Sequence, residues 1–238
     1  MSIPDLSVVV LAYNEEENIA PVLEELFAWL DAHEPGAEVV IVDDGSSDAT
    51  ATNAEVALGD RPGRVVRHGD NRGMGAGLKT GVRSARAPWV TFLPADGQIA
   101  PDAVGTLRAA ADDEVDVVLS VYEDRSDGLH RAFLSFGVRA LILAVHGVRM
   151  ESDGPYLFRR NLFVPEELPP NSFFLNFEFP IRAIGAGLSV RTVTIRCRPR
   201  RSGQSKTAAM RKIATVGREL LDLRVRVVRD WARRARGR

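Results

Sequence analysis

Four consecutive β-branched residues at positions 39–42, followed at once by Asp43, Asp44 and Gly45, constrain the fold more than any other stretch of this chain. Such a run is typical of a strand that is buried on both faces of a sheet. Asp43 and Asp44 come at the carboxyl end of that strand, where ligands bind in open α/β sheets. The alternative is an ordinary acidic turn, so the rest of the chain has to decide between a ligand site and a turn.

Strand-like and helix-like segments alternate on both sides of this stretch. Strands are predicted at 6–12, 39–42, 64–67, 89–93, 115–121 and 190–196, and helices at 19–30, 48–58 and 101–111, with a glycine-rich turn at 71–81 that begins another helix. This alternation predicts an α/β fold with a mostly parallel central sheet flanked by helices. Asp96 follows the strand at 89–93, so carboxylates from two strand ends converge on one edge, which favours a ligand site.

Charge is distributed unevenly along the 238 residues. The formal net charge is only −1, yet residues 207–238 contain ten Lys and Arg against Glu219, Asp222 and Asp230. This asymmetry predicts a basic C-terminal segment that meets an anionic surface, and nothing in the sequence indicates a nucleic-acid partner. We therefore divide the chain into a domain at 1–206 and a basic segment at 207–238.

Cysteine content and hydropathy indicate the compartment. Cys197 is the only cysteine, which excludes an internal disulfide and fits a reducing compartment. No apolar stretch approaches the ~20 residues that a membrane span needs. We expect a cytoplasmic protein, or one held peripherally on the cytoplasmic face of a membrane. The four histidines have no metal-ligand spacing and are interpreted as structural or solvated.

Three segments taken together resemble the family 2 glycosyltransferases. They are Ala12-Tyr13-Asn14-Glu15, Val42-Asp43-Asp44-Gly45-Ser46 and Asn71-Arg72-Gly73-Met74-Gly75. Within that family the chain is most similar to the dolichyl- and polyprenyl-phosphate sugar transferases. The resemblance implies a GT-A fold for residues 1–206 and a UDP- or GDP-sugar as donor. The positions that it assigns to binding the donor nucleotide are Ala12, Tyr13, Glu15, Asp43, Asp44, Gly73 and Asp96.

The resemblance also implies a divalent metal ion. The family's Asp-x-Asp-x-Gln motif corresponds to Pro94-Ala95-Asp96-Gly97-Gln98, so proline replaces the first aspartate. Asp96 and Gln98 remain as oxygen ligands suited to Mg²⁺ or Mn²⁺. Proline has no ligating side chain, so we expect the metal to be bound more weakly or with a different ligand set.

Two further segments match the family's phosphate-binding parts. Arg131 and Ser135 resemble a pair that grips the acceptor phosphate, and their i, i+4 spacing places them on one helix face. Arg200 to Lys206 matches a basic loop that closes over the diphosphate and neutralises the leaving group. The residues that we therefore assign to catalysis are Asp96, Arg131, Ser135, Arg200 and Lys206.

The C-terminal segment reads as a basic amphipathic helix. Apolar residues alternate with arginines from Lys212 to Trp231, a pattern typical of helices that lie on a membrane surface. A packing or oligomerisation helix is the alternative, and a homo-oligomer is left open. The apolar stretch 133–145 is interpreted as a helix partly exposed to lipid, with a core helix as the alternative.

These observations leave three hypotheses for function. The first is an inverting transferase that moves a sugar from a nucleotide diphosphate sugar to a polyprenyl phosphate. The second is a transferase of the same fold with a soluble acceptor in polysaccharide or secondary-metabolite biosynthesis, for which Glu151, Asp153 or Glu178 would act as general base. The third, motivated by Pro94, is a nucleotide-sugar binder without activity.

Overall fold

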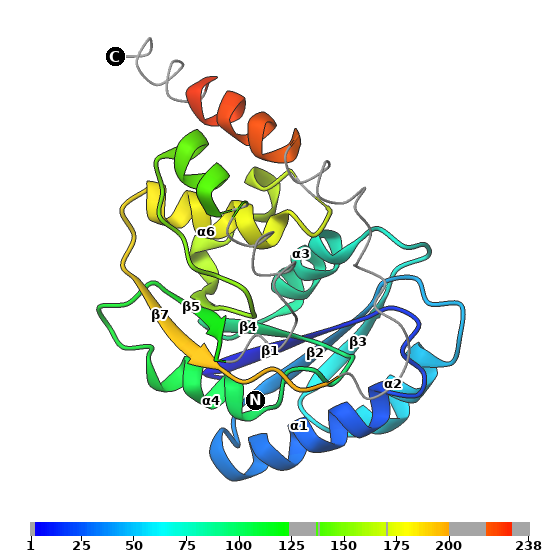
Figure 1. Cartoon of the computed structure of the whole chain (residues 1–238). Coiled ribbons are helices and arrows are strands. Elements are labelled where there is room, and N and C mark those ends of the chain that lie inside the picture. Colours follow the sequence, from blue (N-terminus) through cyan, green and yellow to red (C-terminus); the bar gives the residue numbers. More distant parts are fainter. Residues whose placement is uncertain (1–2, 124–136, 138, 170, 200–217, 230–238) are drawn as a thin grey trace.

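A computed structural model describes residues 3–123, 137, 139–169, 171–199 and 218–229 (Figure 1). Its centre is a seven-stranded sheet with the strand order β3-β2-β1-β4-β6-β5-β7. The strands are β1 (Leu6–Ala12), β2 (Glu38–Asp43), β3 (Gly63–Arg67), β4 (Trp89–Pro94), β5 (Val117–Tyr122), β6 (Leu157–Arg159) and β7 (Val190–Ile195). The helices are α1 (Ile19–His33), α2 (Thr50–Leu58), α3 (Met74–Ser84), α4 (Asp102–Ala109) and α6 (Leu175–Gly185), with 3₁₀ turns η1 (Arg160–Leu162) and η2 (Pro165–Glu167). The predicted α/β fold, with a mostly parallel central sheet flanked by helices, is confirmed.

One strand runs against the others. β1, β2, β3 and β4 pair in parallel, as do β5 and β7, whereas β6 lies between β4 and β5 and is antiparallel to both. The resemblance to family 2 glycosyltransferases implies a turn and a strand through Leu157-Phe158-Arg159-Arg160, and a strand is found at Leu157–Arg159, but its central position in the sheet is not predicted. Because β6 is antiparallel to β4 and β5, the residues just before it lie beside the carboxyl ends of those two strands.

Helices cover both faces of the sheet. α1, α2 and α4 pack on one face, and α3 and α6 on the other (Figure 1). The apolar positions of α1 recur at helical spacing and are all buried, which is why this sequence forms a helix against the sheet: Ile19, Val22, Leu23, Leu26, Phe27 and Leu30. Burying each such side chain contributes about 1.5–3 kcal/mol. The sheet is therefore held rigidly between two apolar layers.

A buried carboxylate ties the amino-terminal edge of the sheet together. Glu38 of β2 is fully buried and accepts hydrogen bonds from Ser7 Oγ at 2.7 Å and from Arg86 Nε at 2.8 Å. Burial opposes ionisation of Glu38, but these hydrogen bonds and the charge of Arg86 outweigh it, so the pKa of Glu38 lies below its usual value. This network locks β1, β2 and the connection into β4 at the edge opposite the candidate site.

Residues 218–229 are helical and pack onto α6. Leu220 and Leu223 are buried in the apolar cluster on that side of the sheet. Arg226 Nη2 lies 2.8 Å from Oε2 of Glu178, a fully buried residue of α6. One face of this helix therefore packs against the domain, as the packing alternative expects. The proposed boundary at 206/207 stays a prediction, because residues 200–217 lie outside the described part.

None of the helices in the described part of the chain has the length and hydropathy of a membrane span.

Candidate nucleotide-sugar site

The carboxyl ends of three neighbouring strands bring several of the predicted site residues to one edge of the sheet. Ala12 of β1 is paired with Asp43 of β2, and Leu11 with Pro94 of β4. Beyond the strands, Asp44 N–H donates to Ala12 O and Ala95 N–H donates to Leu11 O, both at 2.9 Å. The ends of β1, β2 and β4 thus form one edge from which the loops with Tyr13, Asp44 and Asp96 extend.

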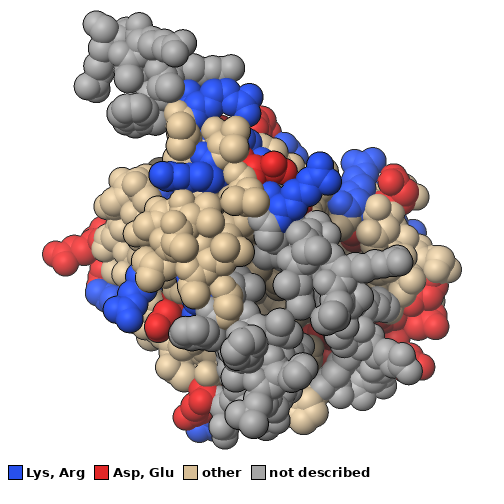
Figure 2. Space-filling model, turned by 45° about the horizontal axis from the view of Figure 1, so that its top comes forward, with Lys and Arg blue, Asp and Glu red and all other residues tan. Residues whose placement is uncertain are grey.

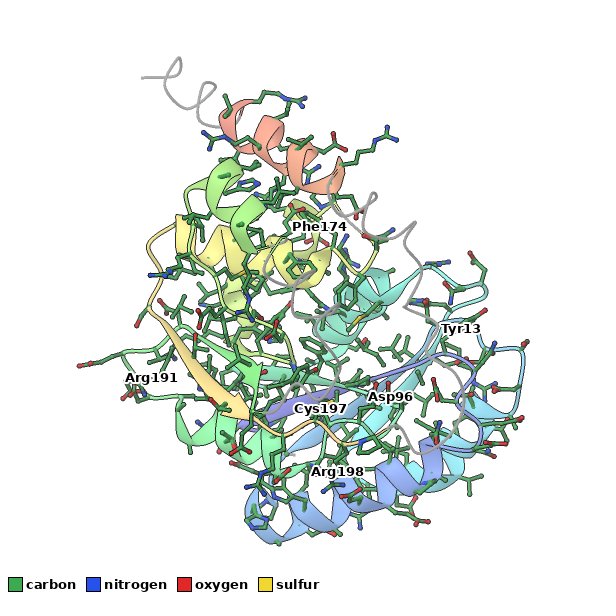
Figure 3. The ribbon with its side chains drawn as sticks, viewed as in Figure 1. Tyr13, Asp96, Phe174, Arg191, Cys197 and Arg198 are labelled. Carbon is green, nitrogen blue, oxygen red and sulfur yellow. The ribbon has the colours of Figure 1, made fainter. Side chains whose placement is uncertain are left out.

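The loop after β1 is held by the loop after β2. Asn14 adopts a left-handed conformation (φ 51°), and its Oδ1 accepts the backbone N–H of Ser47 at 2.9 Å. Its own N–H donates to Ser46 Oγ at 2.8 Å, and Glu15 N–H donates to Thr50 Oγ1 at 2.7 Å. Tyr13, which is 36% exposed, is therefore presented from a fixed backbone (Figure 3).

The two carboxylates at the carboxyl end of β2 have different surroundings. Asp43 is buried, and its Oδ1 accepts both the N–H and the hydroxyl of Ser46. Asp44 accepts hydrogen bonds from the backbone N–H groups of Arg72 at 3.0 Å and Gly73 at 2.8 Å. Asp43 thus shapes its own turn, whereas Asp44 connects that turn to the loop before α3.

His68 is a residue of this site that the sequence interpretation missed. Its side chain is 6% exposed, with Nδ1 at 2.7 Å from Asp44 Oδ1 and Nε2 at 2.9 Å from Thr80 Oγ1. The signal that could have found it is its position directly after β3, at the carboxyl edge of the sheet. Gly45 lies where this turn passes close to the loop before α3, because a Cβ there would lie 2.4 Å from the backbone carbonyl carbon of Asp70.

The glycine-rich start of α3 packs against the chain itself. A Cβ on Gly73 would lie 2.7 Å from Asn171 O, and one on Gly75 would lie 2.6 Å from Ser172 O. Asn171 O also accepts the N–H of Ala76, at 3.1 Å. The small residues of this turn therefore allow a close approach of residues 171–172. None of these contacts tests whether Gly73 binds the nucleotide, so that role stays a prediction.

Asp96 and Gln98 lie on one tight turn after β4. Asp96 Oδ1 accepts the backbone N–H of Gln98 at 3.0 Å, and Gly97 has the positive φ (74°) that this turn requires. Arg198 N–H donates to Gln98 O at 2.7 Å, so the segment after β7 lies against the turn, and Figure 3 shows Arg198 and Cys197 beside Asp96. Pro94 has no ligating group here, and the described residues contain no cluster of three His, Cys, Asp or Glu that could hold a metal.

Further contacts account for two of the carboxylates considered as a general base. Glu178, 0% exposed, lies 2.8 Å from guanidinium nitrogens of both Arg182 and Arg226. Asp153 lies 2.7 Å from Arg139 Nη2, in the segment that leads into β6. Glu151 is exposed. The predicted site residues Arg131, Ser135, Arg200 and Lys206 lie outside the described residues.

Comparisons with known sequences agree on the family. The model of "Glycosyl transferase family 2" matches residues 7–173. A dodecaprenyl-phosphate galacturonate synthase of Rhizobium johnstonii is 31% identical over 155 residues, which are 63% of this chain and 46% of that protein. An undecaprenyl-phosphate 4-deoxy-4-formamido-L-arabinose transferase of Edwardsiella ictaluri is 35% identical over 152 residues, again 63% and 46%. The chain therefore spans about half the length of these curated relatives.

Comparisons with solved structures agree on the fold. Glucosyl-3-phosphoglycerate synthase from Mycobacterium tuberculosis, in a complex with Mn²⁺, UDP-glucose and phosphoglyceric acid, superposes with a TM-score of 0.68. The match covers 92% of this chain and 78% of that one at 21% identity. At this identity the likeness describes the architecture and not the substrate.

Proposed function

This chain belongs to glycosyl transferase family 2, and from that premise we propose that it transfers a sugar from a UDP- or GDP-sugar to a polyprenyl phosphate. The names of two relatives support the acceptor, since both act on phosphates of long polyprenyl chains. The gathering of Tyr13, Asp44 and Asp96 at one sheet edge supports the donor site. In this proposal Ala12, Tyr13, Glu15, Asp43, Asp44 and Gly73 surround the nucleotide.

The donor set of the Asp96 turn fits a divalent cation that is shared with a diphosphate. Mg²⁺ is commonly bound through one or two carboxylates together with substrate phosphates, so Asp96 and Gln98 suffice without a ligand at position 94. Mn²⁺ or Mg²⁺ accompanies UDP in structures of the mycobacterial synthase that shares this fold. Such an ion, when bound, would neutralise charge on the leaving diphosphate. Arg200 and Lys206 are proposed to serve the same end.

Two of the three carboxylates considered as a general base are held by arginines, which favours a phosphate acceptor over a sugar hydroxyl. A hydroxyl needs a general base within hydrogen-bond reach, whereas a phosphate is already anionic. Glu178 is fully buried between two arginines, and Asp153 is paired with Arg139. This pairing is the observation that carries the choice of acceptor. Catalysis then rests on positioning and charge stabilisation, with Arg131 and Ser135 holding the acceptor phosphate.

We also propose that the outer face of residues 218–229 meets a membrane surface. Leu221, Val225 and Val228 are 57%, 58% and 47% exposed and recur at helical spacing. The helical residues 139–146 lie beside them, since His146 Nε2 is 3.1 Å from Leu220 O, and expose Leu141 and Leu143. In Figure 2, Lys and Arg side chains border an uncharged surface on this side. Anionic lipid would attract these cations at about 1 kcal/mol each.

The test of function is transfer of labelled sugar from a panel of UDP- and GDP-sugars to polyprenyl phosphate, with and without Mn²⁺ or Mg²⁺. Label entering the lipid phase is the expected result, with loss of at least about 100-fold in Asp96→Ala. Asp60→Ala is the matched control, because Asp60 is exposed on the turn between α2 and β3. Full turnover by Asp96→Ala would contradict the assignment of that residue. Transfer to a water-soluble acceptor alone would favour the second hypothesis.

A further inference from the structure

The side chain of His68 is clamped between two elements at the edge of the nucleotide site. Its backbone N–H donates to Asp43 O at 2.9 Å, which anchors the residue at the end of β3. Its ring nitrogens contact Asp44 after β2 and Thr80 in α3, at 2.7 and 2.9 Å. Both ring nitrogens are engaged and the ring is nearly buried, so it cannot turn without losing both contacts.

The direction of one of these hydrogen bonds is fixed by chemistry. An ionised carboxylate only accepts, so the proton between His68 and Asp44 resides on Nδ1. Thr80 Oγ1 can donate to a neutral ring or accept from a protonated one, and Nδ1 donates to Asp44 in either case. The contact with Asp44 is therefore a charge-assisted hydrogen bond, the stronger class.

The carboxylate of Asp44 has more hydrogen-bond acceptor positions than the described contacts occupy. A carboxylate offers about four lone-pair positions, two on each oxygen. Oδ1 accepts from His68 Nδ1 and from the N–H of Arg72, and Oδ2 accepts from the N–H of Gly73. Within the hydrogen bonds of the described residues, this leaves one position on Oδ2 for an N–H or O–H of a ligand.

We infer that His68 is a positioning residue for nucleotide binding: it fixes the carboxylate of Asp44 so that the remaining position on Oδ2 faces a donor group of the nucleoside. The backbone N–H groups of Arg72 and Gly73 come from the loop before α3, whereas the His68 ring links Asp44 to Thr80 of α3 and the His68 backbone is anchored at the end of β3. The contact with Thr80 fixes the plane of the His68 ring, and the ring in turn fixes the orientation of the Asp44 carboxylate. This inference rests on the proposed function, because it takes the ligand at Asp44 to be a nucleotide.

Substitutions of His68 separate this role from a purely structural one. In His68→Asn the amide nitrogen lies about where Nδ1 lies, so the hydrogen bond to Asp44 is kept and the one to Thr80 is lost. In His68→Gln the amide reaches toward Thr80 and the bond to Asp44 is lost. The measurements are the dissociation constants of UDP and GDP by calorimetry, KM and kcat for the nucleotide sugar, and the melting temperature. His33→Asn is the control, because His33 is exposed at the end of α1.

His68→Gln is expected to weaken binding of the preferred nucleotide and to raise KM about tenfold, with kcat within about threefold of wild type. His68→Asn is expected to stay within about threefold in every constant, although it melts lower than wild type. Equal dissociation constants for these two variants, or constants that simply follow the melting temperature, would overturn the positioning role of His68 but not the proposed function. Wild-type protein that binds neither UDP nor GDP would overturn the proposed function as well.

Discussion

The buried ion pair between Glu178 and Arg226 yields the most quantitative prediction. Glu178 is fully buried in α6, and Arg226, a quarter exposed, reaches it from the helical residues 218–229. Removing one partner of a buried pair leaves an uncompensated charge and typically costs 3–5 kcal/mol. Arg182 still contacts Glu178, so we take the lower limit and expect Arg226→Met to lower the free energy of unfolding by about 3 kcal/mol.

This loss is measurable by calorimetry or circular dichroism. For a chain of this size, about 3 kcal/mol corresponds to a melting temperature lower by about 6–12 °C. Arg224→Met is the matched control on the same helix, because Arg224 is exposed and should shift the transition by less than about 2 °C. The double variant Glu178→Gln/Arg226→Met should lose less stability than the sum of its two single variants, by about 1–3 kcal/mol.

Two results would refute this reasoning. Equal melting temperatures for Arg226→Met and Arg224→Met would mean that the pair does not hold the C-terminal helix on α6. Strict additivity in the double-variant cycle would mean that the 2.8 Å contact between Glu178 and Arg226 carries no interaction energy.

Two further predictions concern stability. Gly75→Ala places a Cβ 2.6 Å from Ser172 O, so we expect a loss of about 1–3 kcal/mol in urea unfolding, whereas Gly185→Ala, with open space around it, should change stability by less than about 1 kcal/mol. Equal effects would contradict the close packing of α3. Because the pKa of Glu38 is lowered from 4.5 by folding, its ionised form stabilises the protein above about pH 4.5, and this contribution is lost as pH falls through the folded value. The stability difference between wild type and Glu38→Gln should therefore shrink from pH 7 to pH 3, and a constant difference would refute the role of that charge.

Local patterns were sufficient to predict most of the fold. The β-branched run before Asp43 and the helical spacing in α1 each reflect burial against the sheet, so residue period alone identifies them. The position of β6 could not be read in this way, because its period is that of any strand and its neighbours β4 and β5 are chosen by tertiary packing.

The candidate site likewise contains some residues that the sequence pattern predicts and others that it does not. Asp43, Asp44 and Asp96 could be predicted because each lies at or just beyond the carboxyl end of a buried strand. The role of His68 could not, since its partner Asp44 lies 24 residues away and is reached only once β2 and β3 are paired. Glu178 likewise has a partner, Arg226, that is 48 residues distant. Long-range polar contacts of this kind leave no periodic signal in the sequence.

The most direct test of the central claim compares two acceptors that differ only in the phosphate. The wild-type chain is given labelled nucleotide sugar with a polyprenyl phosphate or with the polyprenol of the same length, in the same detergent and with Mn²⁺ or Mg²⁺. Because a phosphate needs no general base, and because Glu178 and Asp153 are held by arginines, we expect transfer to the phosphate and none to the alcohol. Equal transfer to the alcohol, or transfer to neither while a soluble sugar accepts the label, would contradict this expectation.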